Sequence, residues 1–312
     1  MVIKVENLVK RYGELVVLDH FNLEVGEGEI FGLLGPNGSG KSTSIHCMLS
    51  LLTYDKGEVM LFDKKMTPKS YDIKKDIGIV MQNVAVFEEL TVYENIDYFC
   101  SLYVKDKERR KELVESAIDF CALNSFVKFY PAKLSGGLLR RLNIACGIVH
   151  KPKLVIMDEP TVAVDPQSRN NILEGIKKLN KEGTTILYTS HYMEEIEQIC
   201  TRIAIMDRGR IIAKGTKEEL KAMIGLGEKI TMEVYQLERE KLEELKKLPG
   251  VKMASYDGNI LTIKSEKGRN NLSPILHYME EGNVVFGKVY TEMPTLNDVF
   301  LEMTGKELRD NG

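Results

Sequence analysis

One short segment constrains this chain more than any other. The sequence GPNGSGKST begins at Gly35, directly after the apolar run EIFGLL of residues 29–34, and a helical pattern continues from it to Leu52. It fits G-x-x-x-x-G-K-[ST], in which glycines let successive backbone N–H groups point at phosphate oxygens and the helix N-terminus adds partial positive charge. The segment therefore predicts a nucleotide phosphate site. Its residues, called the phosphate loop below, are Gly35, Pro36, Asn37, Gly38, Ser39, Gly40, Lys41, Ser42 and Thr43.

A second apolar run, LVIM at 154–157, ends in the acids Asp158 and Glu159. An acid at the end of a buried strand beside a phosphate loop can hold Mg²⁺, directly or through water, and a neighbouring acid can polarise the attacking water. Lys41 supplies charge to the β- and γ-phosphates, and the Ser42 hydroxyl can ligate the metal. Together these residues predict a P-loop nucleoside triphosphatase.

Bulk properties narrow the class further. The chain has 312 residues and a formal net charge of −3, so it lacks the basic balance of a nucleic-acid-binding protein, and we expect no nucleic acid partner. Its five cysteines are widely spaced without a C-x-x-C pair, which is typical of reduced thiols. No apolar run approaches the roughly 20 residues of a membrane-spanning helix, so a membrane role would need a partner chain.

Other apolar runs predict the remaining fold. Near-continuous hydrophobicity is typical of strands buried on both faces of a parallel sheet, and between about residues 86 and 150 the apolar spacing becomes helical. We predict an α/β core of the P-loop NTPase type over residues 1–220, with a helical subdomain at about 86–150 inserted between its halves. The strand-like runs are residues 77–81, 153–157, 185–189 and 203–206.

The character of the sequence changes after residue 220. Gly225 and Gly227 mark a linker, and Asp257-Gly258 forms a two-residue turn signal between alternating runs. Over residues 228–312 the predicted order is β-α-β-β-α-β, which is that of a small ferredoxin-like α+β domain. We interpret it as an accessory or dimerisation domain; ligand sensing is the alternative, although no ligand pocket is evident in its sequence.

Four further features lie in a fixed order around these motifs. LSGG at 134–137 precedes the carboxylate strand, Gln82 and His191 each follow a predicted strand, and Tyr12 lies near the N-terminus. Singly, such residues usually serve in packing, turns or the surface. As a set they make residues 1–220 resemble the ABC ATPase family. The ordered set is Tyr12, Lys41, Gln82, Ser135, Asp158, Glu159 and His191.

The resemblance implies that the chain binds ATP with Mg²⁺. It implies that Tyr12 stacks on adenine and that His191 holds the γ-phosphate and the attacking water together. It also implies that Gln82 senses Mg²⁺, which Ser42 and Asp158 ligate, and couples the site to a membrane subunit. Lys41, Glu159 and His191 would then be the catalytic residues.

The resemblance also implies a second copy of the chain. Ser135, Gly136 and Gly137 open a helix, where a backbone-rich loop forms an anion site. In the family this loop closes on the γ-phosphate of the partner's nucleotide in a head-to-tail homodimer, and the resemblance places Asp165 among the nucleotide-binding residues, in a loop at that interface. ATP binding would therefore favour dimerisation, and hydrolysis would release it.

Two departures from the family pattern concern this interface. Leu138 stands where the family usually has Gln, and residues 162–164 (Val-Ala-Val) replace a segment that usually contains Gly-Leu. Losing a glycine stiffens the loop. Because Glu159 and Asp165 are retained, we expect an active ATPase. The alternative, which the two departures would favour, is a module that binds ATP without hydrolysing it.

Within the family, the segments SGGLLRRLNIA and TLNDVFLEMTG resemble the bacterial drug- and ion-exporter branch. That branch pairs the ATPase with a separate integral membrane permease, which implies a cytoplasmic chain held on the inner face of the membrane. The alternative is a soluble ABC ATPase acting on ribosomes or DNA. It is disfavoured because the chain has a single cassette and only about 90 residues between the phosphate loop and LSGG. Neither the cargo nor the direction of transport follows from the residues.

Overall fold

The computed structural model describes residues 1–269 and 271–305. It divides into two compact units, of which the first comprises Met1–Lys217 and the second begins at Glu218. Each unit has a hydrophobic core of its own. They are therefore described one at a time.

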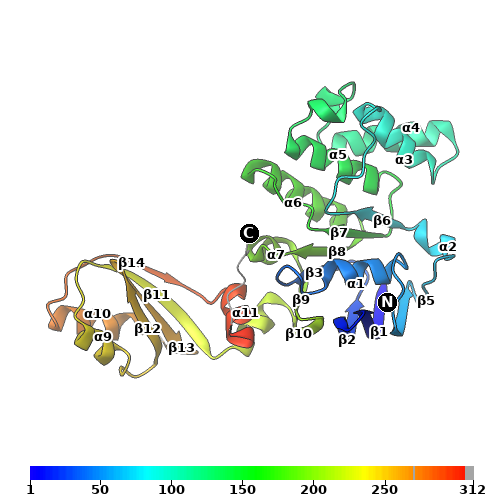
Figure 1. The fold of residues 1–312 in the computed structure, drawn as a ribbon. Helices are drawn as coiled ribbons and strands as arrows, with labels where there is room; N and C mark the ends of the chain where they lie inside the picture. Colours follow the sequence, from blue (N-terminus) through cyan, green and yellow to red (C-terminus); the bar gives the residue numbers. More distant parts are fainter. Residues whose placement is uncertain (270, 306–312) are drawn as a thin grey trace. The chain divides into compact units, whose positions relative to one another are not determined.

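A six-stranded sheet forms the centre of the first unit (Figure 1). Five strands run parallel, and β10 lies antiparallel to β9 at one edge. Strands β3, β7 and β8 are buried along their whole length, as their near-continuous apolar sequences predict, and the parallel sheet is confirmed. In spatial order the strands are β10 (Arg210–Gly215), β9 (Arg202–Asp207), β3 (Ile30–Leu34), β8 (Thr185–Ser190), β7 (Leu154–Asp158) and β6 (Ile77–Val80).

Three helices follow strands of this sheet: α1 (Lys41–Met48) after β3, α6 (Pro166–Lys181) after β7, and α7 (Met193–Ile199) after β8. Because β3, β8 and β7 are parallel neighbours, their carboxyl ends meet at one edge of the sheet. The phosphate loop, the two acids and His191 all begin at that edge.

A smaller antiparallel sheet and α1 complete the core of this unit. Side chains from the small sheet, including Leu8 and Phe21, are fully buried in one cluster with Leu33 of β3 and with Ile45 and Met48 of α1. A short helix, α2, lies between β5 and β6. The small sheet has the order β2 (Leu15–Val25), β1 (Ile3–Tyr12), β4 (Lys56–Leu61) and β5 (Lys64–Lys65), and α2 spans Tyr71–Lys74.

Helices α3, α4 and α5 lie together beyond the β6 edge of the sheet (Figure 1). They pack through buried side chains such as Ile96, Val114 and Leu142. Thr91 and Glu94 begin α3 with a capping box, which satisfies N–H groups that the helix itself leaves unpaired. All three lie within the stretch predicted to be helical: α3 is Val92–Ser101, α4 is Lys107–Phe120 and α5 is Gly136–Ile148, with 3₁₀ turns at Asn124–Phe126 and Pro131–Lys133.

The second unit is built around a four-stranded antiparallel sheet with the order β12-β13-β11-β14. Ile230, Met232 and Ile263 of the sheet are buried with Ile275 and Met279 of α10. None of the helices formed by the described residues is long and apolar enough to cross a bilayer. The elements are α8 (Lys217–Met223), β11 (Leu226–Val234), α9 (Arg239–Leu245), β12 (Val251–Asp257), β13 (Ile260–Glu266), α10 (Leu272–Glu281), β14 (Phe286–Glu292) and α11 (Leu296–Thr304).

Candidate functional site

The phosphate loop lies between β3 and α1, and glycine is required at two of its positions. A Cβ on Gly35 would lie 2.4 Å from the carbonyl oxygen of Met206, which no side chain can approach so closely. Gly40, the residue before α1, has a φ of 105°, and a Cβ there would lie 2.9 Å from the Val17 carbonyl oxygen. The loop thus keeps its curled backbone because these two residues have no side chain.

Lys41 is buried in the middle of this loop. Its Nζ donates to the carbonyl oxygens of Gly35 at 2.8 Å and Pro36 at 3.2 Å, and it forms an ion pair with Glu159 Oε1 at 3.2 Å. Ser39 contributes a buried hydroxyl that has no hydrogen-bond partner among the described residues. A buried donor without a partner is costly, and a phosphate oxygen would satisfy it.

The two acids differ in their surroundings, although they are adjacent. Asp158 ends β7, and its Oδ1 accepts a 2.6 Å hydrogen bond from the hydroxyl of Thr189 on β8. The N–H of Glu159 donates to the carbonyl and hydroxyl oxygens of that threonine, at 3.2 and 3.0 Å. The pairing of β7 with β8 places Thr189 opposite Asp158. Thr189 belongs to no motif that marks it in the sequence, although a hydroxyl in a buried strand is a polar group that needs a partner.

Glu159 joins Lys41 to His191. Its Oε2 lies 3.2 Å from His191 Nδ1, and the side chains of all three residues are at least nine-tenths buried. Burial would raise the pKa of Glu159, but the hydrogen bond with His191 and the charge of Lys41 outweigh it and lower the pKa below its ordinary value. Glu159 is therefore an ionised carboxylate that can orient water or accept its proton.

A second buried acid, Glu195 of α7, lies behind this cluster and was missed from the sequence. The Thr161 hydroxyl donates to the two oxygens of the Glu195 carboxylate at 2.7 and 2.8 Å, and this carboxylate also accepts from the hydroxyls of Tyr188 at 2.8 Å and Ser190 at 3.0 Å. Arg169 Nε of α6 forms an ion pair with it at 3.3 Å. The sequence contains one indication of its burial: Glu195 lies four residues before Ile199, and therefore on the same apolar face of a short helix.

This network connects two loops of the site. Thr161 begins the loop of residues 161–165, called the interface loop below, whereas Ser190 precedes His191. The Ser190 hydroxyl also accepts from the N–H of Tyr192 at 2.9 Å. Because one carboxylate holds both loops, Glu195 fixes the position of His191 relative to the interface loop.

Ser135 begins α5, with its hydroxyl accepting from the N–H of Leu138 at 3.3 Å. Gly137 packs against the first turn of α6, where an added Cβ would lie 2.5 Å from Ser168 Oγ. Asp165 begins α6, and its carboxylate accepts from the N–H of Ser168 at 2.9 Å. The LSGG segment, which Leu138 follows, and the interface loop, which contains residues 162–164, are thus neighbours within one chain.

The remaining predicted residues lie on other elements. Tyr12, at the end of β1, is 49% exposed, with Lys10 Nζ 5.0 Å from its ring centre. Gln82 follows β6 with an exposed side chain, and its carbonyl oxygen accepts from Arg140 Nη2 at 2.8 Å. The structure therefore brings together Lys41, Asp158, Glu159 and His191, and it leaves Tyr12, Gln82 and Ser135 outside this cluster.

The donor set suits Mg²⁺ bound together with phosphate. Among the described residues, no three His, Cys, Asp or Glu side chains gather to hold a metal ion by themselves. Mg²⁺ usually takes one or two protein ligands, and water and phosphate oxygens supply the others. Asp158 accepts from Thr189 through Oδ1, and Ser42 follows Lys41 at the start of α1, so a carboxylate and a hydroxyl of the types that ligate Mg²⁺ stand at this sheet edge.

A curled phosphate loop with a buried lysine after β3, paired acids at the end of β7, and a histidine after β8, the strand between those two, define a P-loop nucleoside triphosphatase. Residues 18–162 match the family model described as ABC transporter. The chain is 35% identical to the linearmycin resistance ATP-binding protein LnrL of Bacillus subtilis, over 99% of this chain and 100% of that protein. It is 33% identical to the Nod factor export ATP-binding protein I of Cupriavidus metallidurans, over 99% of each chain.

Solved structures agree with the sequence relatives. A dimeric ATP-binding cassette in a post-hydrolysis state, bound to ADP and phosphate, matches with a TM-score of 0.63 and 28% identity, over 69% of this chain and 98% of that one. The chain belongs to the ABC transporter family, as an ATP-binding subunit with ATPase activity.

Proposed function

We propose that this chain is the energy-coupling ATPase of an ABC exporter, driving transport by a separate membrane permease. The observation that carries the proposal is the buried contact between Lys41, Glu159 and His191, which joins a phosphate-binding lysine to a group that can activate water. Two relatives matched along their whole length are ATP-binding proteins for linearmycin resistance and Nod factor export. Those relatives favour export over an action on ribosomes or DNA.

Hydrolysis uses the residues already gathered at the sheet edge. Lys41 exchanges the Glu159 carboxylate for the β- and γ-phosphate oxygens when ATP enters the loop. Glu159 is then free to orient a water molecule and accept its proton, while His191 holds that water against the γ-phosphate. Ser42, Asp158 and Gln82 would hold Mg²⁺, which neutralises phosphate charge when bound. Tyr12 is exposed and therefore available to stack on adenine.

A head-to-tail homodimer would complete each site. Ser135, Gly136 and Gly137 open α5, where backbone N–H groups without helical partners can contact a partner's γ-phosphate. Asp165 lies beside Gly137, so both would meet the partner together. The dimeric cassette among the similar structures supports this arrangement.

An exposed aromatic patch supports docking to a permease. Phe87, Tyr98 and Phe99 contact one another with ring centres 4.9 to 6.0 Å apart, and Leu102 and Tyr103, which directly follow α3, are 61% and 44% exposed. Large exposed apolar groups that gather in this way mark interaction surfaces. The patch begins five residues after Gln82, which would link it to the nucleotide site. Binding there would hold the chain on the inner face of the membrane.

We assign an accessory or dimerisation role to the second unit. The register of its sheet places Met253 and Tyr290 on the face opposite its buried core, and they are 55% and 57% exposed. A second copy of the chain would cover such a face.

Affinity purification of the tagged chain from its native host tests this function. Detergent-solubilised membranes should yield a multi-span membrane protein, and Tyr98→Glu should lose it while Tyr71→Glu, at another exposed aromatic position, keeps it. Recovery of ribosomes or DNA without a membrane protein would contradict the exporter role.

A further inference from the structure

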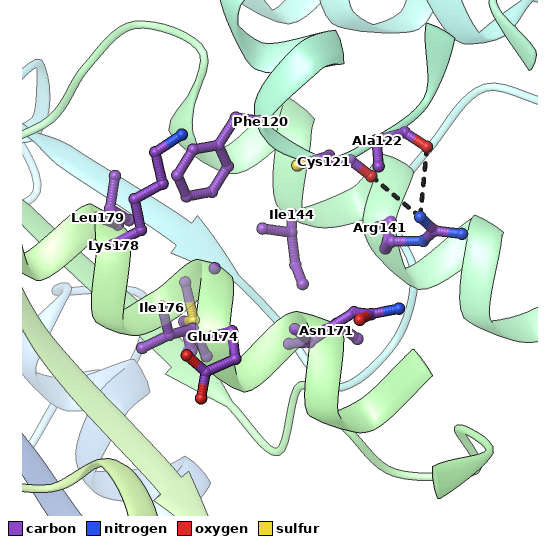
Figure 2. Close-up of a pocket in the computed structure, with 13 residues that line it drawn as sticks. Phe120, Cys121, Ala122, Arg141, Ile144, Asn171, Glu174, Ile176, Lys178 and Leu179 are labelled. Atoms are coloured by element: carbon purple, nitrogen blue, oxygen red, sulfur yellow. Dashed lines mark hydrogen bonds between the residues drawn. The ribbon is translucent and has the colours of Figure 1, made fainter. Parts of the chain in front are cut away.

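A cavity of about 360 Å³ lies between the helical subdomain and the sheet-covering helix α6, and its lining residues do not include Lys41, Asp158, Glu159 or His191 (Figure 2). The end of α4, the middle of α5 and the middle of α6 form its walls. Most of its lining is apolar, and Figure 2 shows Ile144 projecting into the space between Phe120 and α6. The apolar lining includes Phe120, Ile144, Met157, Ile172, Ile176 and Leu179.

The sequence keeps this space open. Protein interiors contain few voids larger than a water molecule, and an unfilled cavity costs stability in proportion to its volume. Gly175 lies in the cavity wall in the interior of α6, where glycine is unfavourable relative to alanine. A Cβ there would reach only ordinary contact with the Phe120 ring, at 3.6 Å, so a larger residue would occupy the cavity itself.

The charged residues that line the cavity are two cations, Arg141 and Lys178, and one acid, Glu174. Arg141 donates from Nη1 to the carbonyl oxygens of Cys121 and Ala122, and its buried Nε has no hydrogen-bond partner among the described residues (Figure 2). Lys178 Nζ lies 5.3 Å from the centre of the Phe120 ring. The acid at the rim, Glu174, is paired with Lys177 at 2.8 Å. A buried N–H of a charged guanidinium is a strong donor for an anion.

We propose that this cavity binds a small apolar anion, in which an aromatic or aliphatic body fills the apolar walls and a carboxylate or sulfonate accepts from Arg141. Its volume falls in the range of about 300–1,000 Å³ that small-molecule sites occupy. An apolar wall with a few placed polar groups is also the usual composition of such sites.

The position of the cavity connects it to turnover. Helices α5 and α6 touch closely at their first turns, where Gly137 leaves no room beside Ser168, and they part around the cavity. An occupant would therefore fix the spacing of the helices that carry Ser135 and Asp165. We expect the occupant to slow ATP hydrolysis, an expectation that rests on the proposed function.

Two fluorescent probes test the site on the full chain. The anionic probe 8-anilinonaphthalene-1-sulfonate should bind saturably, and ATP should not displace it. Gly175→Leu, which fills the cavity, should abolish binding, whereas Asn170→Leu on an exposed part of α6 should leave it unchanged. Arg141→Gln should lower the affinity for the anionic probe about 10-fold, as expected for the loss of a charge-assisted hydrogen bond. The affinity for the uncharged counterpart N-phenyl-1-naphthylamine should not change.

Circular dichroism should first show that each variant is folded. Binding that survives Gly175→Leu, or that ATP displaces, would overturn the site. An equal effect of Arg141→Gln on both probes would overturn the preference for an anion. The sulfonate probe should lower kcat in the wild type and in Asn170→Leu but not in Gly175→Leu. Binding without that change would overturn the regulatory part alone, whereas absence of ATP turnover without probe would contradict the proposed function.

Discussion

Lys41 and Glu159 form an ion pair of 3.2 Å in the interior of the phosphate loop, with both side chains at least nine-tenths buried. The lysine that would bind phosphate is therefore held by the acid that would activate water. Each group neutralises the other, and His191 adds a second contact to the acid. Occupation of the loop by phosphate would separate the pair and prepare both groups for the reaction.

This pair predicts a specific coupling of free energies. Lys41→Met should lower the free energy of unfolding of the nucleotide-free protein by about 1–3 kcal/mol, because Glu159 loses a buried partner. Adding Glu159→Gln to the Lys41→Met variant should recover part of that loss, since the side chain at position 159 then carries no charge. Urea unfolding of the wild type, both single variants and the double variant measures the interaction. Additive losses would show that the pair contributes nothing.

The interface loop predicts an unusual effect of glycine. Ala163 has a φ of 58°, a left-handed conformation that costs an L-residue about 1–2 kcal/mol. Ala163→Gly should relieve this strain and raise the free energy of unfolding. The gain should be smaller than the strain by roughly 0.5–1 kcal/mol, because glycine gives the unfolded chain more conformational freedom.

The same exchange in a helix is the matched control. Ala117→Gly in α4 should destabilise by at least about 1 kcal/mol. A destabilising Ala163→Gly, measured by the same urea titration, would contradict the strain.

Glu195 predicts a loss of stability together with a loss of turnover. Glu195→Ala would leave the Thr161, Tyr188 and Ser190 hydroxyls without their acceptor, and each unsatisfied buried polar group costs about 1–3 kcal/mol. Glu195→Gln keeps acceptor atoms and should be milder. Because the network positions His191, we expect kcat to fall more than KM rises. Unchanged kcat in a folded Glu195→Gln variant would limit this residue to a structural role.

The thiols should be unreactive in the folded chain. Burial raises the pKa of Cys47 to about 11 and that of Cys121 to about 12, and it also raises the pKa of Cys100, Cys146 and Cys200. At pH 8 a thiol of pKa 11 is ionised in about one molecule in a thousand, and only the thiolate reacts rapidly. Ellman's reagent should therefore label native protein slowly and all five thiols rapidly in guanidinium. Rapid native labelling would contradict the burial of these residues.

Much of the first unit follows from local sequence. The phosphate loop carries its own conformational requirements at Gly35 and Gly40, and the buried strands are marked by continuous apolar runs. In the second unit, the Asp257-Gly258 pair predicts a hairpin turn, which the structure forms one residue later, at Gly258 and Asn259 between β12 and β13. Each of these features depends on residues close together in the sequence, so a single segment contains the information that determines its local structure.

The missed residues depend on contacts between distant segments. Thr189 matters because strand pairing places it opposite Asp158, and Glu195 matters because three hydroxyls from two other segments converge on it. Nothing in the letters around Ala163 indicates its left-handed backbone, which the surrounding loop imposes. The cavity beside Gly175 is a gap between three helices and has no sequence motif at all.

The most direct test of the account is the rate of Mg²⁺-dependent ATP hydrolysis by purified wild type and Glu159→Gln. The wild type should turn over ATP, and the variant should be slower by about 100-fold or more, because general-base catalysis contributes roughly 10²–10⁴ in rate. The variant should still bind ATP, since Lys41 and the phosphate loop are intact. A variant that hydrolyses ATP as fast as the wild type would contradict the role given to Glu159, and with it the proposed mechanism.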